Sequence, residues 1–579
     1  MYKTQRSLLA LLAIFFSTTL FAQTIIDIEI SGVDKPLKDN ILLFLSVEQQ
    51  KGQQQMNEGR LRRLHNKAPQ EISKALQPFG YYRAVVDKKI SKSEAGHWLL
   101  SYNIDTGPAL RVAHFDFSIS EEMRNDEMFQ QLIDKHSLQE GSEFSHVDYE
   151  NFKSSLAKMA SERGYFDARF IEHRVEIDLD AYEVGIYLNY EGGIRYHFGE
   201  VLLDQNIIEH ELLQRYIPFE RGTPYTLDQL IELQQALNDS DYFQTVEVSP
   251  AKPLPGSNEI PIAVKLTPRK RHRFSFGLGY GTDTGARASF RWEMPRVNRH
   301  GHRFDTDARV SEIGYSLVAH YRVPILNPRT DQLIYTAGIV HETTDTTDST
   351  LRTIGASLKR KRGDWRETVS LNYQNEDFIV ADDSGNSILL IPSASWSRTW
   401  GDNFIIAFDG LRFDIGVSGA SNQLISDASF SQLQGGIKSI HSLSQTDRFI
   451  LRGNAGGTNT QEFHKLPTTV RFFAGGAQSV RGYAYNSLGP VDEDGKVVGG
   501  KYLLVGSAEF EHNFKNKWSV AVFYDVGNAI DNINDELATG AGFGFRWKSP
   551  VGPVRVDLAS GLSLEGNPWR IHINIGPDL

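Results

Sequence analysis

Residues 518–527 read WSVAVFYDVG, and every even-numbered position of this stretch is Trp, Val or Tyr. The odd-numbered positions carry Ser, Ala, Phe, Asp and Gly. A period of two is typical of a β-strand whose two faces meet different surroundings. We therefore expect Asp525 to lie on the opposite face of this strand from Val522 and Tyr524.

Segments of the same kind follow one another from Arg271 to the C-terminus, separated by turns or polar loops. One face of each segment is apolar, whereas the other is small, charged or amide-bearing. The clearest cases are residues 273–280, 333–339, 541–547, 554–559 and 571–575. A β-sandwich shares this alternation, but about 310 residues of it, with Trp and Tyr near strand ends, fit a transmembrane β-barrel better. At roughly 19 residues per strand and connection, the region predicts about 16 antiparallel strands.

The N-terminus has the features of a secretory signal. Lys3 and Arg6 precede an uninterrupted apolar run from Leu8 to Phe16, and Ala22 offers a cleavage point. We expect residues 1–22 to be a signal peptide. The alternative is an uncleaved anchor helix, but the run is too short to cross about 30 Å of hydrocarbon.

A weak repeat of roughly 80 residues fills the chain between the signal and the barrel. Each copy reads strand, helix, helix, strand, strand, and the copies turn at Gly80-Tyr81-Tyr82, Gly164-Tyr165-Phe166 and Asp241-Tyr242-Phe243. Gly and Asp tolerate a left-handed backbone after a helix, and we expect each aromatic pair to plug the core of its own module. The repeat predicts three α+β modules at 23–107, 108–193 and 194–268, followed by the barrel at 269–579.

Composition and charge argue against several classes of function. The formal net charge is −11, which argues against a nucleic-acid partner, and the absence of cysteine excludes a disulfide scaffold and a thiolate metal site. We find neither a nucleophile elbow nor a zincin spacing, and we expect no enzyme activity, metal or cofactor. We interpret the basic run 359–362 as a segment that faces lipopolysaccharide or solvent.

An arginine on a loop and an aspartate on a strand form a candidate pair. The Val480-Arg481-Gly482-Tyr483 stretch lies in a long Gly-rich loop that is flexible enough to fold into a barrel. A guanidinium binds a carboxylate through two parallel hydrogen bonds, which Lys cannot reproduce. We hypothesise that Arg481 meets Asp525 on the inner wall; the alternative is a solvated loop arginine.

These motifs resemble those of the BamA/TamA superfamily of outer-membrane assembly factors, in which periplasmic POTRA modules precede a 16-stranded barrel. The resemblance rests on the Val-Arg-Gly-Tyr loop, the Phe-x-Asp-x-Gly strand at 523–527, and GFGFR at 542–546 before SPVGP at 549–553. Three modules and the ending IGPDL are most similar to TamA-type members. A terminal Leu579 replaces the Phe at the end of many outer-membrane proteins.

The resemblance implies a role for each residue of the loop-to-wall dock. Arg481 is the loop-tip arginine, Asp525 is its acidic partner, and Tyr483 completes the loop motif. It also implies that Gly482 lets the loop backbone pass close to the wall, and that Phe523 and Gly527 shape the dock.

The resemblance further implies an activity, a location and partners. The protein would be the outer-membrane subunit of a translocation and assembly module that assembles autotransporter-type and other barrels. Its modules would lie in the periplasm. Its partners would be unfolded outer-membrane protein clients, outer-membrane lipid and a TamB-like protein anchored in the inner membrane.

The junction between the first and last strands is a second candidate site. The first strand contains Gly277 and Gly279, and the last is short, carries Ile573 and ends at Gly576-Pro577. Gly weakens a strand, and Pro donates no ladder hydrogen bond. We hypothesise a lateral seam that opens sideways; the alternative is an ordinary barrel closure.

Two other transport functions remain open. A two-partner secretion transporter exports an unfolded exoprotein, but it usually has two modules and an N-terminal plug helix. A porin with a periplasmic docking arm is the other alternative. The third repeat copy argues against the first of these.

Overall fold

A computed structural model describes residues 25–52, 56–94, 97–253, 255–381, 383–403, 405–549 and 552–575. The expected signal peptide and Gly576 of the expected seam lie outside these residues. None of the helices in the described ranges is long and apolar enough to cross a membrane.

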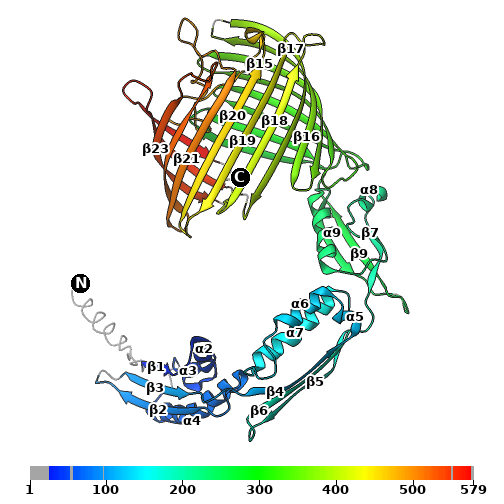
Figure 1. The fold of residues 1–579 in the computed structure, drawn as a ribbon, viewed down its shortest axis with the longest axis vertical. Coiled ribbons are helices and arrows are strands. Elements are labelled where there is room, and N and C mark those ends of the chain that lie inside the picture. Colours follow the sequence, from blue (N-terminus) through cyan, green and yellow to red (C-terminus); the bar gives the residue numbers. More distant parts are fainter. Residues whose placement is uncertain are drawn as a thin grey trace, which may run out of the picture. The chain divides into compact units, whose positions relative to one another are not determined.

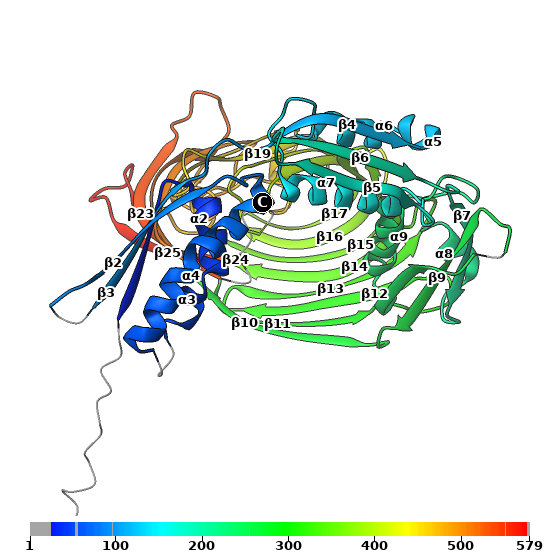
Figure 2. The same ribbon diagram turned by 90° about the horizontal axis from the view of Figure 1, so that it is seen from below.

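The C-terminal region of the described chain forms one 16-stranded antiparallel sheet in which each strand pairs with the next, so the predicted barrel is confirmed (Figures 1 and 2). Its strands are β10 (Arg273–Gly281), β11 (Gly285–Met294), β12 (Arg303–Ser311), β13 (Gly314–Pro324), β14 (Gln332–Thr343), β15 (Thr347–Arg362), β16 (Trp365–Val380), β17 (Asp383–Gly401), β18 (Gly410–Ala420), β19 (Phe430–Ser442), β20 (Asp447–Asn459), β21 (Tyr502–Lys515), β22 (Trp518–Ile530), β23 (Ala538–Ser549), β24 (Gly552–Gly561) and β25 (Trp569–Ile575).

The two faces of β22 differ as the alternation predicts. Val522 and Tyr524 are 57% and 49% exposed, whereas Phe523 and Asp525 are 5% and 0% exposed. Apolar side chains therefore cover the outer surface of the barrel, where they suit lipid, and the carboxylate of Asp525 faces the lumen.

Three small sheets precede the barrel, with strand orders β1-β3-β2, β4-β6-β5 and β7-β9-β8. Their strands are β1 (Ile26–Ser31), β2 (Val85–Lys92), β3 (Trp98–Asp105), β4 (Arg111–Ile119), β5 (Arg169–Asp178), β6 (Glu183–Glu191), β7 (His197–Asp204), β8 (Phe243–Pro250) and β9 (Glu259–Pro268). In each module the last strand is central, so the first two strands are the sheet edges.

Helices connect the first and second strands of every module. They are α2 (Lys35–Phe44), α3 (Ser46–Gln50), α4 (Glu58–Leu76) and the 3₁₀ turn η1 (Gln77–Phe79) in the first module, α5 (Glu121–Arg124), α6 (Glu127–Lys135) and α7 (His146–Glu162) in the second, and α8 (His210–Gln214) and α9 (Leu227–Asp239) in the third. The third module follows the expected order of elements, and the first two contain additional short helices.

The described chain divides into two compact units. One contains the first two modules with residues 220–229 and 251–261, and the other contains residues 201–219, 230–250 and 262–579. The division crosses the third module, and the module boundaries expected from the repeat stay predictions.

The matched turns have the left-handed backbone that the sequence predicts, with φ of +87° at Gly80, +86° at Gly164 and +60° at Asp241. The first aromatic residue of these pairs packs as expected: Tyr81 lies against the core of the first module, and Tyr165, 2% exposed, belongs to the core of the second. The expected role is wrong for the second aromatic residue, Tyr82 and Phe166. Phe166 is 38% exposed, and its ring contacts Tyr225 of the third module with centroids 5.0 Å apart.

Tyr82 of the first turn likewise packs against the core of the second module. The Tyr82 hydroxyl lies 3.0 Å from Nε2 of His146, at the start of α7. The physical reason is that Leu110 N donates to the Gly80 carbonyl at 3.0 Å, which turns this segment toward the second module.

Gly80→Ala is expected to destabilise this joint by about 3 kcal/mol or more. A Cβ at Gly80 would lie 2.1 Å from the Phe144 carbonyl oxygen, in addition to the strain of a positive φ. Gly141→Ala is the matched control, because Gly141 has φ +85° but open space around its Cβ position, and about 1 kcal/mol is expected there. Hydrogen exchange of the Leu110 and Phe144 amides measures the difference; equal exchange in both variants would contradict the steric argument.

The core of the first module contains a carboxylate whose titration predicts acid sensitivity. Glu71 of α4 accepts a hydrogen bond from Ser46 N at 2.9 Å and another from the Ser46 hydroxyl, and it pairs with Lys67 at 2.9 Å. Burial raises the pKa of the Glu71 carboxyl, but the Ser46 hydrogen bonds and the Lys67 ammonium together outweigh burial, so the pKa lies below its usual value.

A carboxyl with a lowered folded pKa stabilises the fold above its unfolded pKa of about 4.3. That stabilisation disappears as the pH falls through the folded value. We expect Glu71→Gln to be less stable at pH 7 and to show a flatter acid response than the wild type. Hydrogen exchange of α4, corrected for intrinsic rates, checks this from pH 7 to pH 3; parallel profiles would contradict it.

Candidate functional site: the loop dock and the seam

The loop between β20 and β21, residues 460–501, reaches the inner wall of the barrel. Val480, Arg481 and Tyr483 are buried, at 0%, 4% and 3% exposure. Gly482 has φ +96°, and a Cβ there would lie 2.6 Å from Gly561 N on β24. The loop backbone therefore passes so close to the wall that only glycine fits at this position.

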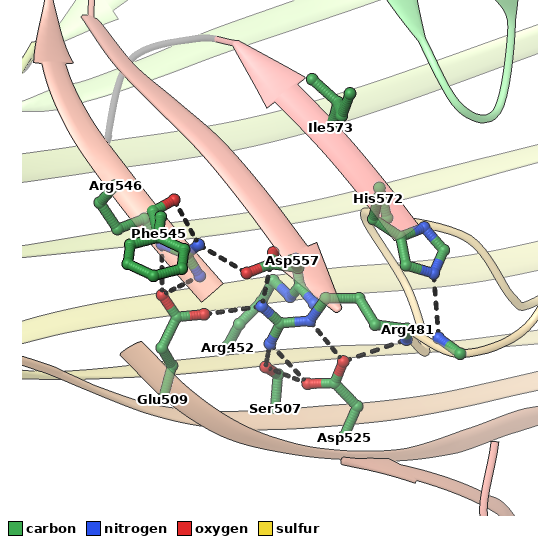
Figure 3. A network of polar contacts seen from close by, with 12 residues as sticks. Arg452, Arg481, Ser507, Glu509, Asp525, Phe545, Arg546, Asp557, His572 and Ile573 are labelled. Carbon is green, nitrogen blue, oxygen red and sulfur yellow. Dashed lines mark hydrogen bonds and ion pairs between the residues drawn. The ribbon is translucent and has the colours of Figure 1, made fainter. Parts of the chain in front are cut away.

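Arg481 and Asp525 lie in direct contact, as Figure 3 shows. Nε of Arg481 donates to Oδ2 of Asp525 at 2.7 Å, and Nη2 donates to Oδ1 at 2.8 Å. The backbone N–H of Arg481 donates to the same carboxylate at 3.1 Å. Nη1 reaches Glu509 at 2.7 Å and Asp557 at 3.2 Å, and Nη2 reaches the Ser507 hydroxyl at 3.2 Å. One guanidinium thus connects the loop tip to β21, β22 and β24.

A second buried arginine completes this network. Arg546 of β23 is 0% exposed, and it donates to Glu509 at 2.8 Å and to Asp557 at 2.5 Å. Arg481 and Arg546 therefore share Glu509 and Asp557 as acceptors. Of these two arginines, Arg481 is the one that binds Asp525. Because each buried charge has opposite charges within hydrogen-bond distance, the network avoids the cost of an isolated ion.

The other expected dock residues surround this pair. The guanidinium carbon of Arg481 lies 3.4 Å from the centroid of the Phe523 ring. The Tyr483 hydroxyl donates to Thr539 O at 3.0 Å. Gly527 adjoins β21, where a Cβ would lie 2.5 Å from Leu504 O, so glycine at this position permits close strand packing.

Sequence reasoning did not single out Ser507, Glu509, Arg546 or Asp557 as dock residues. The signal that identifies them is alternation, because each follows or precedes an outward apolar residue in its strand. Phe510, Phe545 and Val556 are exposed, at 36%, 53% and 39%. Their immediate neighbours in sequence therefore face the lumen.

The first and last strands of the barrel meet at the junction that the sequence identifies as the seam. β10 and β25 end the order of hydrogen-bonded strands, and their described residues share no backbone ladder. Ile573 N donates to Oγ1 of Thr282 at 3.3 Å across this junction. Gly277 and Gly279 lie in β10, where added Cβ atoms would meet the Ser289 and Arg287 side chains of β11.

The family model described as the Omp85 superfamily domain matches residues 270–578, more than half of the chain. The chain belongs to the Omp85 superfamily. Models for the first POTRA domain of TamA and for the POTRA surface antigen variable number repeat match residues 27–106 and 196–269.

Relatives and solved structures agree with this family. The outer membrane protein assembly factor BamA of Nitratidesulfovibrio vulgaris is 22% identical over 517 residues, which are 85% of this chain and 64% of that protein. BamA of Neorickettsia risticii is 28% identical over 211 residues, 33% of this chain and 27% of that protein. The crystal structure of BamA from Haemophilus ducreyi lacking POTRA domains 1–3 has a TM-score of 0.68 at 15% identity, over 81% of this chain and 99% of that one, and so shares the fold.

This Omp85 protein is located in the bacterial outer membrane, with its POTRA modules in the periplasm. The modules identify the periplasmic end of the barrel, because Tyr242 OH donates to Gly301 O at 2.7 Å and Arg329 pairs with Glu232 at 2.8 Å. Gly301 lies in the turn between β11 and β12, and Arg329 lies in the turn between β13 and β14.

The orientation corrects one expectation about the basic run 359–362. Strands alternate in direction, so the β15–β16 turn lies at the same end as the two turns that contact the third module. The basic run ends β15 at this periplasmic turn. Lipopolysaccharide occupies the opposite leaflet, so of the two expected surroundings of this run only solvent remains.

Among the residues of the ranges given above, no group of three or more His, Asp or Glu side chains is placed to hold a metal ion. The dock consists of arginines and carboxylates that already bond one another. Its arrangement is suited to holding a loop against a wall.

Proposed function

We propose that this Omp85 chain inserts and assembles outer-membrane proteins, autotransporter-type barrels among them, through the seam between β10 and β25. In this proposal it is the outer-membrane subunit of a translocation and assembly module. The mechanism needs no chemical step, nucleotide or cofactor.

The observation that carries the proposal is that no backbone ladder joins the described residues of β10 and β25. An unpaired strand edge in hydrocarbon costs several kcal/mol per polar backbone group. A client strand that adds to β10 or β25 removes this cost, because main-chain hydrogen bonds replace the missing ones with little demand on sequence. The seam is thus the place in the wall where the energy of strand addition is greatest.

The modules support the capture of unfolded clients. β2 is an edge strand of the first module, and Val85 at its start is 67% exposed. An extended client segment can pair with such an edge before it reaches the barrel. The match of residues 27–106 to the first POTRA domain of TamA also supports a TamB-like partner anchored in the inner membrane. In this proposal the open seam disturbs the outer-membrane lipid around it.

The docked loop weighs against a porin, because the buried network of Arg481 and Arg546 holds chain inside the lumen. A purified full-length protein in liposomes tests the proposal with a urea-denatured autotransporter β-domain as client. We expect faster formation of a heat-resistant, membrane-inserted client than in empty liposomes, and slower formation when residues 24–268 are removed.

Other outcomes of this experiment would reject the proposal. Release of a soluble unfolded exoprotein across the membrane, without client insertion, indicates a two-partner secretion transporter. Large, steady conductance that does not depend on residues 24–268 indicates a porin.

A further inference from the structure

The inward loop contacts both sides of the seam, not only the wall that carries Asp525. Asp283 lies in the turn after β10, and its Oδ2 accepts a hydrogen bond from Ala477 N at 2.9 Å. His572 lies on β25, and its Nε2 accepts a hydrogen bond from Gly482 N at 3.0 Å (Figure 3). The short segment from Ala477 to Gly482 therefore bridges the two strands that no described ladder joins.

Asp283 and His572 also face each other. Nδ1 of His572 lies 3.8 Å from Oδ1 of Asp283, and the side chains are 1% and 16% exposed. Within the described residues neither atom has another hydrogen-bond partner. A backbone N–H can only donate, so Nε2 of His572 is unprotonated and its ring proton is on Nδ1, directed at Asp283.

We propose that Asp283 and His572 are positioning residues that clasp the loop across the seam, so that undocking of the loop tip and separation of β10 from β25 are coupled. The proposal rests on the function proposed for the seam. Ala477 is bound to Asp283 in the turn after β10, and Gly482 is bound to His572 on β25. The loop therefore spans the seam only while both hydrogen bonds are in place. Coupling of this kind is reciprocal: opening the seam loosens the loop, and releasing the loop loosens the seam.

The test uses the full chain in lipid nanodiscs, with no client. Because the chain has no cysteine, introduced cysteines are the only labelling sites. Val480→Cys reports loop release, since Val480 is 0% exposed, and its maleimide labelling is normalised to that of the unfolded chain. Nitroxides at Leu278 and Ile571, which are 91% and 52% exposed, report the width of the seam.

His572→Phe keeps the ring size but removes the acceptor. We expect about tenfold faster labelling at position 480, together with a longer and broader distance between the two nitroxides. His572→Gln is the conservative control, because its amide oxygen takes the place of Nε2, and labelling within about twofold of the wild type is expected. Asp283→Ala combined with His572→Phe is expected to add little to either change alone.

Rescue by His572→Gln separates positioning from a merely structural role, because only this variant restores an acceptor for the Gly482 N–H. Heat-resistant migration of every variant controls for folding. Unchanged labelling in His572→Phe, or faster labelling with an unchanged seam distance, would overturn the clasp.

These readouts need no client, so they are independent of the assembly assay. If clients fail to insert while the labelling results hold, the proposed function fails and the clasp remains. If clients insert and the seam distance does not depend on His572, the clasp proposal fails and the proposed function remains.

Discussion

Replacing Arg481 with Ala is expected to free the loop from the wall and to slow client assembly by at least about tenfold, while the barrel remains folded. The substitution leaves Asp525, which is 0% exposed, without its guanidinium, and it removes one of the two arginines that neutralise Glu509 and Asp557. Breaking a buried ion pair by removing one partner costs about 3–5 kcal/mol. The docked state therefore loses roughly two to four powers of ten in population.

The barrel strands keep their ladders in this variant, because the dock contributes side chains and not backbone pairing. Limited proteolysis of residues 460–501 measures loop release, and the liposome assay measures assembly. Arg481→Lys is expected to lie between the wild type and Arg481→Ala, since an ammonium keeps the charge but not the paired hydrogen bonds.

Arg412→Ala is a matched control for this prediction. Arg412 is another arginine of the lumen wall, on β18, and its contact with Asp414 is long, at 3.7 Å. We expect its loss to leave proteolysis and assembly close to the wild type. If Arg481→Ala behaves like Arg412→Ala, the dock has no part in function.

The period-two alternation of apolar and polar residues was sufficient to predict the barrel, and with it the pair of Arg481 and Asp525 on the inner wall. A strand alternates with period two whatever its neighbours are, so the inward direction of Asp525 followed from residues 518–527 alone. The three left-handed turns followed in the same way, because the preference of Gly80 for positive φ is a property of that residue.

Properties that depend on distant segments were not accessible in this way. Glu509 and Asp557 are two of many charged residues that face the lumen, and only the stagger of the strands determines which of them reach Arg481. Phe166 was misassigned for a related reason, since its partner Tyr225 belongs to another module. The orientation of the basic run required only a count of alternating strands, starting from a known periplasmic end.

A disulfide between cysteines introduced at Gly281 and Ile573 is expected to abolish client assembly, and reduction is expected to restore it. A Cβ at Gly281 would lie 3.9 Å from the Ile573 carbonyl oxygen, so the two positions adjoin across the seam. The bond replaces a junction without a described ladder by a covalent one, which prevents the edges from separating to accept a client strand. Assembly under oxidising and reducing conditions is measured in the same liposomes, with each single cysteine variant alongside.

The control is a disulfide between cysteines at Gly416 and Gln434, which are opposite each other on β18 and β19. Those strands are already joined by a continuous ladder, so a covalent bond there changes nothing that the function requires, and full activity is expected. Loss of activity with both disulfides would point to general rigidity of the barrel. Full activity with the seam closed would show that clients do not pass between β10 and β25, because a strand cannot add to an edge that is covalently paired with its neighbour.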